Sequence, residues 1–205
     1  FGAQLFDDTG RVTLDQSGGA ADYLAWLATV NNTPGSYVDA DYGMLLDRFK
    51  KGEFAYLVDG PWSLRELREA LGDNLAVATL PAGPAGPARP WLYADGLFFN
   101  PKLDETRRPL VLAVGQALTS AQSGTILAQT AGLLPAARAA ELGGDPLLAA
   151  FAAQAADASA LPTGPEMAEV WAYGGDMLLK ALTGVAPPPA IVAETTALIN
   201  EANGK

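Results

Sequence analysis

Aromatic rings and carboxylates are the side chains of this 205-residue chain that could recognise a ligand, because it holds neither histidine nor cysteine. Trp62 stands directly behind Gly60 and Pro61, where the apolar stretch 54–58 ends and a helix has not yet begun. An indole fixed at such a turn can stack on the apolar face of a pyranose, and Asp59 can accept hydrogen bonds from hydroxyl groups. From these residues alone, a buried strand-end tryptophan is the better interpretation.

The composition excludes several classes of function. Without histidine and cysteine there are no Ser-His-Asp triads, thiolate sites or disulfides, and the usual zinc sites are excluded. The net charge of −10, with only 13 lysines and arginines, argues against nucleic acid and against anionic membrane surfaces. No apolar stretch approaches the roughly 20 residues of a membrane span.

Carboxylate catalysis and phosphate binding also lack a pattern. Glu166 and Glu169 lie three residues apart on one expected helix, but acids at this spacing on an exposed face are commonplace, and no spacing singles out a catalytic pair. The run "GPAGPARP" is stiffened by proline and lacks the phosphate-loop spacing. We therefore expect no enzyme, no metal and no cofactor, with a carboxylate glycoside hydrolase as a disfavoured possibility.

Periodicity and turn residues predict an α/β chain with a long helical second half. A hairpin turns at Asp8-Thr9-Gly10, and Ser17 is expected to cap the first helix. Three strands are expected at 54–58, 75–81 and 91–99, and the Pro/Gly run between the last two must be loop. The first expected helix begins after Ser17. The other expected helices cover 41–50, 62–71, 110–120, 123–132, 132–142, 145–156, 164–184 and 187–202.

Five segments carry a resemblance to a known family. In chain order they are "FKKGEFAYLVDGPW", "NLAVATLPAGPAG", "WLYADGLFFNP", "LTSAQSGTILAQTAGLLPA" and "LPTGPEMAEVWAYGGDMLLKALTG". Together they resemble the second half of bacterial extracellular solute-binding proteins of the maltose-binding type. The resemblance implies a type II periplasmic-binding-protein-like lobe, α/β with helices around a mixed sheet, and implies that the family's first half is absent. It divides the chain into 1–92 with 158–205 in one lobe, and 93–157 in the other.

The resemblance also implies ligand-binding roles for particular residues. It favours sugar stacking for Trp62, near Asp59, and it places Trp171 at the family's sugar-stacking aromatic. A second aromatic often follows in maltodextrin binders; here Ala172 follows, and Tyr173 is displaced by one. Asp95, on the expected strand 91–99, could accept hydrogen bonds from hydroxyl groups. The alternatives are core packing for Trp171 and a solvated turn before Gly96 for Asp95.

The function implied is the carbohydrate-binding component of an ABC sugar importer, which closes two lobes around an oligosaccharide. Its partners would be the sugar, the membrane permease and the missing N-terminal half of the same protein, with no nucleic acid. An extracytoplasmic location follows, with a signal or anchor expected on the missing part. The alternative is a solute-binding-like domain with a structural or sensory role, attached to a permease or signalling protein.

Overall fold

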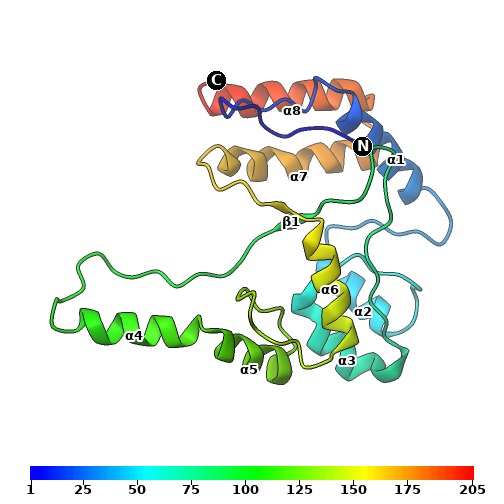
Figure 1. Ribbon diagram of the computed structural model, residues 1–205. Helices are drawn as coiled ribbons and strands as arrows, with labels where there is room; N and C mark the ends of the chain where they lie inside the picture. Colours follow the sequence, from blue (N-terminus) through cyan, green and yellow to red (C-terminus); the bar gives the residue numbers. More distant parts are fainter. The chain divides into compact units, whose positions relative to one another are not determined.

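Helices make up nearly all of the regular structure (Figure 1). The computed structural model describes every residue from Phe1 to Lys205. The helices are α1 (Gly19–Asn31), α2 (Tyr42–Lys50), α3 (Leu64–Leu71), α4 (Arg108–Leu118), α5 (Ala121–Ala131), α6 (Pro146–Ala156), α7 (Met167–Thr183) and α8 (Pro188–Ala202). The remaining elements are two 3₁₀ turns, η1 (Pro61–Ser63) and η2 (Gly72–Asn74), and two short strands, β1 (Trp91–Leu92) and β2 (Ser159–Ala160).

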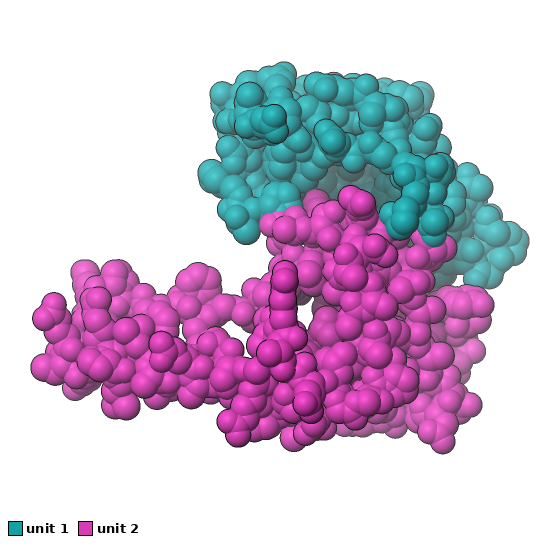
Figure 2. Space-filling model, in the orientation of Figure 1, with its two compact units in different colours: residues 1–43, 82–87, 162–205 teal, residues 44–81, 88–161 magenta.

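The chain forms two compact units, each built from separate stretches of sequence (Figure 2). Unit 1 contains Phe1–Gly43, Ala82–Pro87 and Pro162–Lys205, and unit 2 contains Met44–Pro81 and Ala88–Leu161. These boundaries differ from the division expected from the sequence, which follows the lobes of the resembling fold. The assignment of 1–92 with 158–205 to one lobe and 93–157 to the other stays a prediction.

The core of unit 1 lies where α1, α7 and α8 pack against one another. Leu24 of α1 and Ile191 of α8 are fully buried there, beside Ala181 of α7. Helix α8 buries a stripe at positions 191, 195 and 199 because residues four apart lie on one helical face. Pro188 occupies the first helical position, where its missing N–H costs no hydrogen bond.

The expected N-terminal turn is present and is tied to α8. Gly10 adopts a left-handed φ of 76°, and a single antiparallel bridge joins Phe6 to Val12. The buried Asn200 side chain of α8 accepts from the Val12 N–H at 2.8 Å and donates to the Val12 carbonyl at 3.0 Å. Both backbone groups of Val12 are therefore satisfied by one side chain.

The start of the first helix is a correction to the sequence-based prediction. Ser17 does not cap it: the N-cap residue is Gly18, with a left-handed φ of 72° and no side-chain cap. Gly19 is buried so closely against the backbone of Phe1 that a Cβ there would overlap the Phe1 carbonyl. The helix begins where the chain passes the N-terminal segment, because only glycine permits that approach.

Unit 2 is built on α3, α5 and α6. Leu64, Ala128 and Leu148 form its buried cluster. Asp145 caps α6 by accepting from the N–H groups of Leu147 and Leu148, and it pairs with Arg68 of α3 at 2.6 Å. Burial raises the pKa of this carboxyl, but the hydrogen bonds from Arg68 and the two N–H groups outweigh it and leave the pKa lowered.

The expected strands are only partly formed. Trp91 and Leu92 pair in parallel with Ser159 and Ala160, while 93–99, 54–58 and 75–81 lie in no ladder. Leu75 and Val77 still pack on the cluster of unit 2, and the exposed Ala76 lies between them, as in a strand. These segments have the side-chain pattern of strands but no neighbouring backbone to pair with in this chain.

A helix expected over 132–142 is also wrong. Gly132 ends α5 with a left-handed φ of 66°, and only turn and bend structure follows. Pro135 disfavours a helical conformation of the preceding Leu134, and residues 132–135 have no regular structure. The helix and loop predictions elsewhere are confirmed, with shifted ends, and they include the loop after residue 81.

Candidate ligand-binding site

The turn at Gly60-Pro61-Trp62 presents its indole outward. Gly60 is buried in an extended conformation, and Pro61 begins η1. The hydroxyl group of Ser63 donates to the Gly60 carbonyl at 3.1 Å. A Cβ on Gly60 would overlap the six-membered ring of Trp62, so the ring lies directly against the glycine backbone. With 58% of Trp62 still exposed, the turn holds a flat aromatic surface toward solvent.

Asp59 is part of the same turn. Its carboxylate accepts from the Gly60 N–H at 2.7 Å, and the residue is half-buried. The side chain is thereby fixed three residues before the indole. Asp59 and Trp62 are the two predicted site residues that lie in one local structure in unit 2.

Trp171 lies in the second turn of α7 and is 61% exposed. The buried face of this helix carries Met167 and Val170 instead. Tyr173 is half-buried, and two residues along a helix correspond to about 200° around its axis. Trp171 and Tyr173 therefore face different sides of α7, and only Trp171 presents a largely open ring. Core packing, the alternative interpretation of Trp171, is not what the structure shows.

Two glycines follow Trp171 on its own side of α7. Gly174 and Gly175 stand three and four residues after it, the spacing that places side chains next to each other on a helix. A Cβ built at either position would meet no atom within 4 Å. Consecutive glycines inside a helix are costly, each by about 1 kcal/mol relative to alanine. The sequence carries this signal as "WAYGGD", and the two glycines are not among the predicted site residues.

Asp95 lies in the extended segment that follows β1 and is exposed. Trp91 and Tyr93 precede it and are 42% and 60% exposed. Asp59, Trp62 and Asp95 belong to unit 2, whereas Trp171 and Tyr173 belong to unit 1 (Figure 2). The joint action of these five residues at one site stays a prediction.

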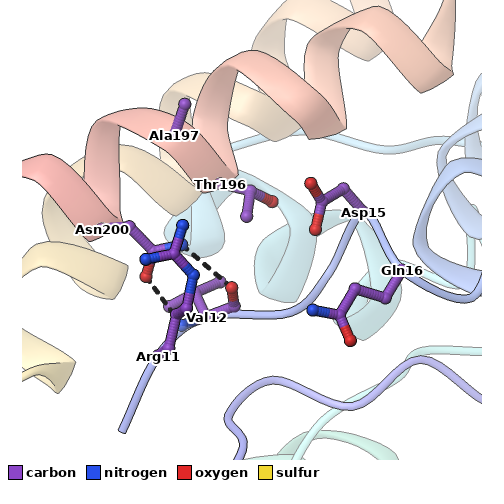
Figure 3. Close-up of a pocket in the computed structure, with 7 residues that line it drawn as sticks. All are labelled: Arg11, Val12, Asp15, Gln16, Thr196, Ala197 and Asn200. Carbon is purple, nitrogen blue, oxygen red and sulfur yellow. Dashed lines mark hydrogen bonds between the residues drawn. The ribbon is translucent and has the colours of Figure 1, made fainter. Parts of the chain in front are cut away.

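Two surface pockets lie away from these residues. One, of about 160 Å³, lies in unit 1 between the segment 11–16 and α8 (Figure 3). It contains the Asn200 contact with Val12 and the buried Oγ1 of Thr196, which has no hydrogen-bond partner. The other, of about 360 Å³, lies in unit 2 between α3 and the end of α5. No cluster of three carboxylates that could hold a metal ion is present.

No single helix has the length and apolar character needed to cross a membrane. Only the bent pair α4 and α5, with 51° between them, reaches that length and composition together. Such a pair is weak evidence for a membrane segment.

Comparison with known protein families shows to which family the chain belongs. Residues 1–163 match the family model of the bacterial extracellular solute-binding proteins. The chain belongs to this family. It is a family of solute-binding proteins rather than of enzymes, and its members act outside the cytoplasm. Comparison with curated protein sequences finds no match.

Solved structures of low sequence identity share the fold of this family member. The maltose/maltodextrin-binding domain MalE of Bdellovibrio bacteriovorus, bound to maltotriose, matches all of this chain and 55% of its own, with a TM-score of 0.80 and 20% identity. The sugar-binding protein MalE of Xanthomonas citri matches 98% of this chain and 53% of its own, with a TM-score of 0.81 and 19% identity. The maltose-maltodextrin binding protein of Alicyclobacillus acidocaldarius matches with a TM-score of 0.75 and 23% identity, over 98% of this chain and 57% of its own.

These matches confirm the expected type of fold and the expected family. The chain spans about half the length of the structures it matches. The helix-rich α/β arrangement is thus part of a periplasmic-binding-protein fold.

Proposed function

We propose that this chain is the carbohydrate-binding part of an ABC-importer receptor, in which Trp62 and Trp171 stack on the rings of an oligosaccharide. The observation that carries this proposal is the exposure of both indoles at positions that the backbone holds in place. Trp62 lies on Gly60, and Trp171 borders the bare helix surface of Gly174 and Gly175. Tryptophan is highly buried on average, and these two are the most exposed of the four tryptophans in the chain.

The chemistry of the surrounding groups suits a neutral, polar ligand. A pyranose offers an apolar face to an indole and a rim of hydroxyl groups to acceptors. Asp59 and Asp95 supply carboxylates, and Tyr173 supplies a phenol on another side of α7. The solved structures described as maltose- and maltodextrin-binding proteins support a glucose oligosaccharide as the first ligand to test.

The mechanism that follows is capture between two lobes. Ligand binding favours the closed form, and the permease of the importer recognises that form. This role requires an extracytoplasmic location and both lobes of the receptor. The N-terminal half and a signal or anchor are therefore components that we expect in the complete receptor.

The deciding experiment replaces Trp62 with alanine in the complete receptor and titrates it with maltose and maltotriose. We expect the affinity to fall by about 1–3 kcal/mol, which is typical of truncating an aromatic anchor. The free energy of unfolding should change by no more than about 0.5 kcal/mol, because an exposed ring loses little packing.

The matched control is Trp26→Ala. Trp26 is 49% exposed and contacts the rings of Phe1 and Tyr23, so it has no expected ligand role. Its replacement should leave sugar affinity unchanged. A Trp62→Ala variant that loses about 3–5 kcal/mol of stability and keeps its affinity would mark a core residue and refute the stacking role.

A structural or sensory role, as a solute-binding-like domain attached to a permease or signalling protein, is the second candidate. A chain that carries one part of a two-lobed cleft could serve as a module of a larger membrane protein. Flanking membrane spans in the complete gene product, together with no heat of binding for any sugar, would establish this role instead.

A further inference from the structure

The pocket of Figure 3 lies wholly within unit 1 and has no part in the proposed sugar site. Its volume of about 160 Å³ is well below the roughly 300 Å³ at which sites for drug-sized ligands begin, so an occupant held by its walls must be small. The segment 11–16 contributes Arg11, Asp15 and Gln16 to the lining, and α8 contributes Thr196 and Asn200. One cationic, one anionic and several uncharged polar groups therefore surround this small volume.

Thr196 has an unused hydroxyl group at the pocket. The residue is 3% exposed, and its Oγ1 is buried without a hydrogen-bond partner. Other helical threonines, such as Thr29 and Thr183, donate to the carbonyl four residues earlier in their helix. Oγ1 of Thr196 instead points toward Asp15 (Figure 3). Leaving a buried hydroxyl group without a partner costs stability, and a ligand that forms a hydrogen bond with it would offset that cost.

The two charged residues of the pocket are also available to a ligand. Neither Arg11 nor Asp15 forms a salt bridge with another residue of the chain. Figure 3 shows the Arg11 side chain on the side of Asn200 and the Asp15 side chain on the side of Thr196. The pocket therefore presents a positive charge at one end and a negative charge at the other.

The second pocket, between α3 and the end of α5, differs in this respect. Its two arginines are Arg65 and Arg68. They pair with Glu69 at 3.1 Å and with Asp145 at 2.6 Å. The arginines of that pocket already have carboxylate partners within the protein, so their charges give no indication of a ligand.

Hydrogen bonds hold the segment 11–16 in place without a ligand. The Arg11 N–H donates to Oδ1 of Asp7 at 3.0 Å, and the Arg11 carbonyl accepts from the Asp7 N–H, also at 3.0 Å. Both backbone groups of Val12 are bound to α8, and the Gln16 N–H donates to the Thr13 carbonyl at 3.1 Å. Because this backbone is already ordered, a ligand at the pocket would lose little binding free energy to the ordering of the segment.

We propose that this pocket binds a small zwitterion, an α-amino acid, with its carboxylate at Arg11 and its ammonium group between Asp15 and Oγ1 of Thr196. A guanidinium group donates two parallel hydrogen bonds to a carboxylate, and carboxylate and hydroxyl oxygens accept from an ammonium group. An inorganic anion would be repelled by Asp15, and a simple cation would be repelled by Arg11. A neutral sugar would pair with neither charge. The inference holds independently of the sugar-binding proposal.

The test titrates the complete receptor with L-serine and follows the amide resonances of residues 11–16 and 195–200 by NMR. We expect saturable shifts in these two stretches. Glycerate, which lacks the ammonium group, and ethanolamine, which lacks the carboxylate, should each bind at least about 10-fold more weakly, because each loses a charge-assisted hydrogen bond. Absence of shifts with L-serine would mean that the pocket holds water only and would overturn the inference. Equal binding of glycerate or ethanolamine, or the same shifts with maltotriose, would assign the pocket to another ligand and would also overturn it.

Variants make the test specific to the pocket. Arg11→Ala and Asp15→Asn should each weaken L-serine binding by about 10-fold and leave thermal unfolding unchanged, since both residues are exposed. Thr196→Val keeps the shape of the side chain and should weaken binding by about 3-fold without loss of stability, because the hydroxyl group it removes has no partner within the protein.

The matched control is Asp22→Asn, which removes an exposed carboxylate from α1 of the same unit. This variant should bind L-serine as tightly as the wild type. An equal loss of affinity in Asp22→Asn and Asp15→Asn would show a general effect of charge and overturn the inference. A receptor that binds L-serine at the pocket but gives no heat with maltotriose would refute the sugar-binding proposal alone.

Discussion

The two units of this chain differ in how completely their apolar surfaces are covered. In unit 1, three helices close around Leu24 and Ile191, both with no exposed surface. In unit 2, the buried cluster of Leu64, Ala128 and Leu148 is smaller, and an apolar stripe along α4, at positions 110, 114 and 118, is exposed. Both units are built from helices, of 13–17 residues in unit 1 and of 8–11 residues in α3 to α6 of unit 2. The contrast in burial shows that a helix's apolar face is stabilising only when the chain also supplies its partner.

The largest effect should come from a cavity in the core of unit 1. Leu24→Ala or Ile191→Ala should lower the free energy of unfolding by about 2–5 kcal/mol, because each removes a fully buried side chain. Leu110→Ala in unit 2 should change it by no more than about 0.5 kcal/mol in this chain. Urea denaturation of the three variants, followed by circular dichroism, measures the contrast. Equal losses at Leu24 and Leu110 would show that unit 2 is as closed as unit 1.

The next largest effect should come from the two buried hydrogen bonds between Asn200 and the backbone of Val12 in unit 1. Asn200→Ala should cost about 1–3 kcal/mol, because the buried N–H and C=O groups of Val12 lose their partner. Asn32→Ala is the control, since that amide donates to the Ala28 carbonyl at an exposed helix end. The two variants are compared by thermal unfolding. A neutral Asn200→Ala would mean that water replaces the amide in the pocket of Figure 3.

A smaller effect is expected at the cap that joins α3 to α6 in unit 2. Asp145→Ala should cost about 1 kcal/mol through loss of the N-cap. Because the folded state lowers the pKa of this carboxyl, its contribution is fully present above the ordinary aspartate pKa near 4. It disappears as the pH falls through the lowered value in the folded protein.

The free energy of unfolding, measured between pH 7 and pH 2, tests whether the contribution of Asp145 is lost on acidification. The wild-type protein should lose more stability than Asp145→Ala on acidification, so the two curves should approach each other at low pH. Glu69→Ala is a suitable control, because that carboxylate forms an exposed pair with Arg65. Parallel curves for the wild type and Asp145→Ala would contradict the role of Asp145 as a charged cap.

The smallest effect on stability should be a gain. Gly174→Ala and Gly175→Ala should each stabilise α7 by about 0.5–1 kcal/mol, because alanine is the better helix former and meets open space. If a sugar lies beside Trp171, the added methyl groups should weaken its binding to the complete receptor. Titration with maltotriose and thermal unfolding of the same variants separate the two effects. A stabilised receptor with unchanged affinity would place the ligand elsewhere.

Local signals predicted the helices of this protein well. Asp145 with Pro146 began α6, and Gly52 after basic residues ended α2, as capping rules require. Predictions failed where contacts distant in sequence decide. Ser17 did not cap α1, because the close passage of Phe1 beside Gly19 sets its start. Residues 132–142 form no helix, although their alanines and leucines suit one, because Gly132 turns the chain out of α5.

For the site residues too, the sequence selected candidates, and the structure decided their exposure and orientation. Sequence and resemblance selected Trp62 and Trp171, and the structure adds that both rings are more than half exposed. It also separates Trp171 from Tyr173, since a helix turns their side chains to different sides. The part played by Gly174 and Gly175 emerged only once the space around α7 was known.

The sequence by itself determined the helices, the turn before Trp62 and the family, because all of these depend on residues close together in the chain. Tertiary structure decided which apolar faces are covered and which strand-like segments pair. A strand satisfies its backbone only through a neighbour, and an apolar stripe is buried only by another surface. The stretches 54–58 and 75–81 therefore have strand-like sequences but lie in no sheet. Helix α8 also needs another surface to bury its apolar face, and α1 and α7 of the same chain provide it.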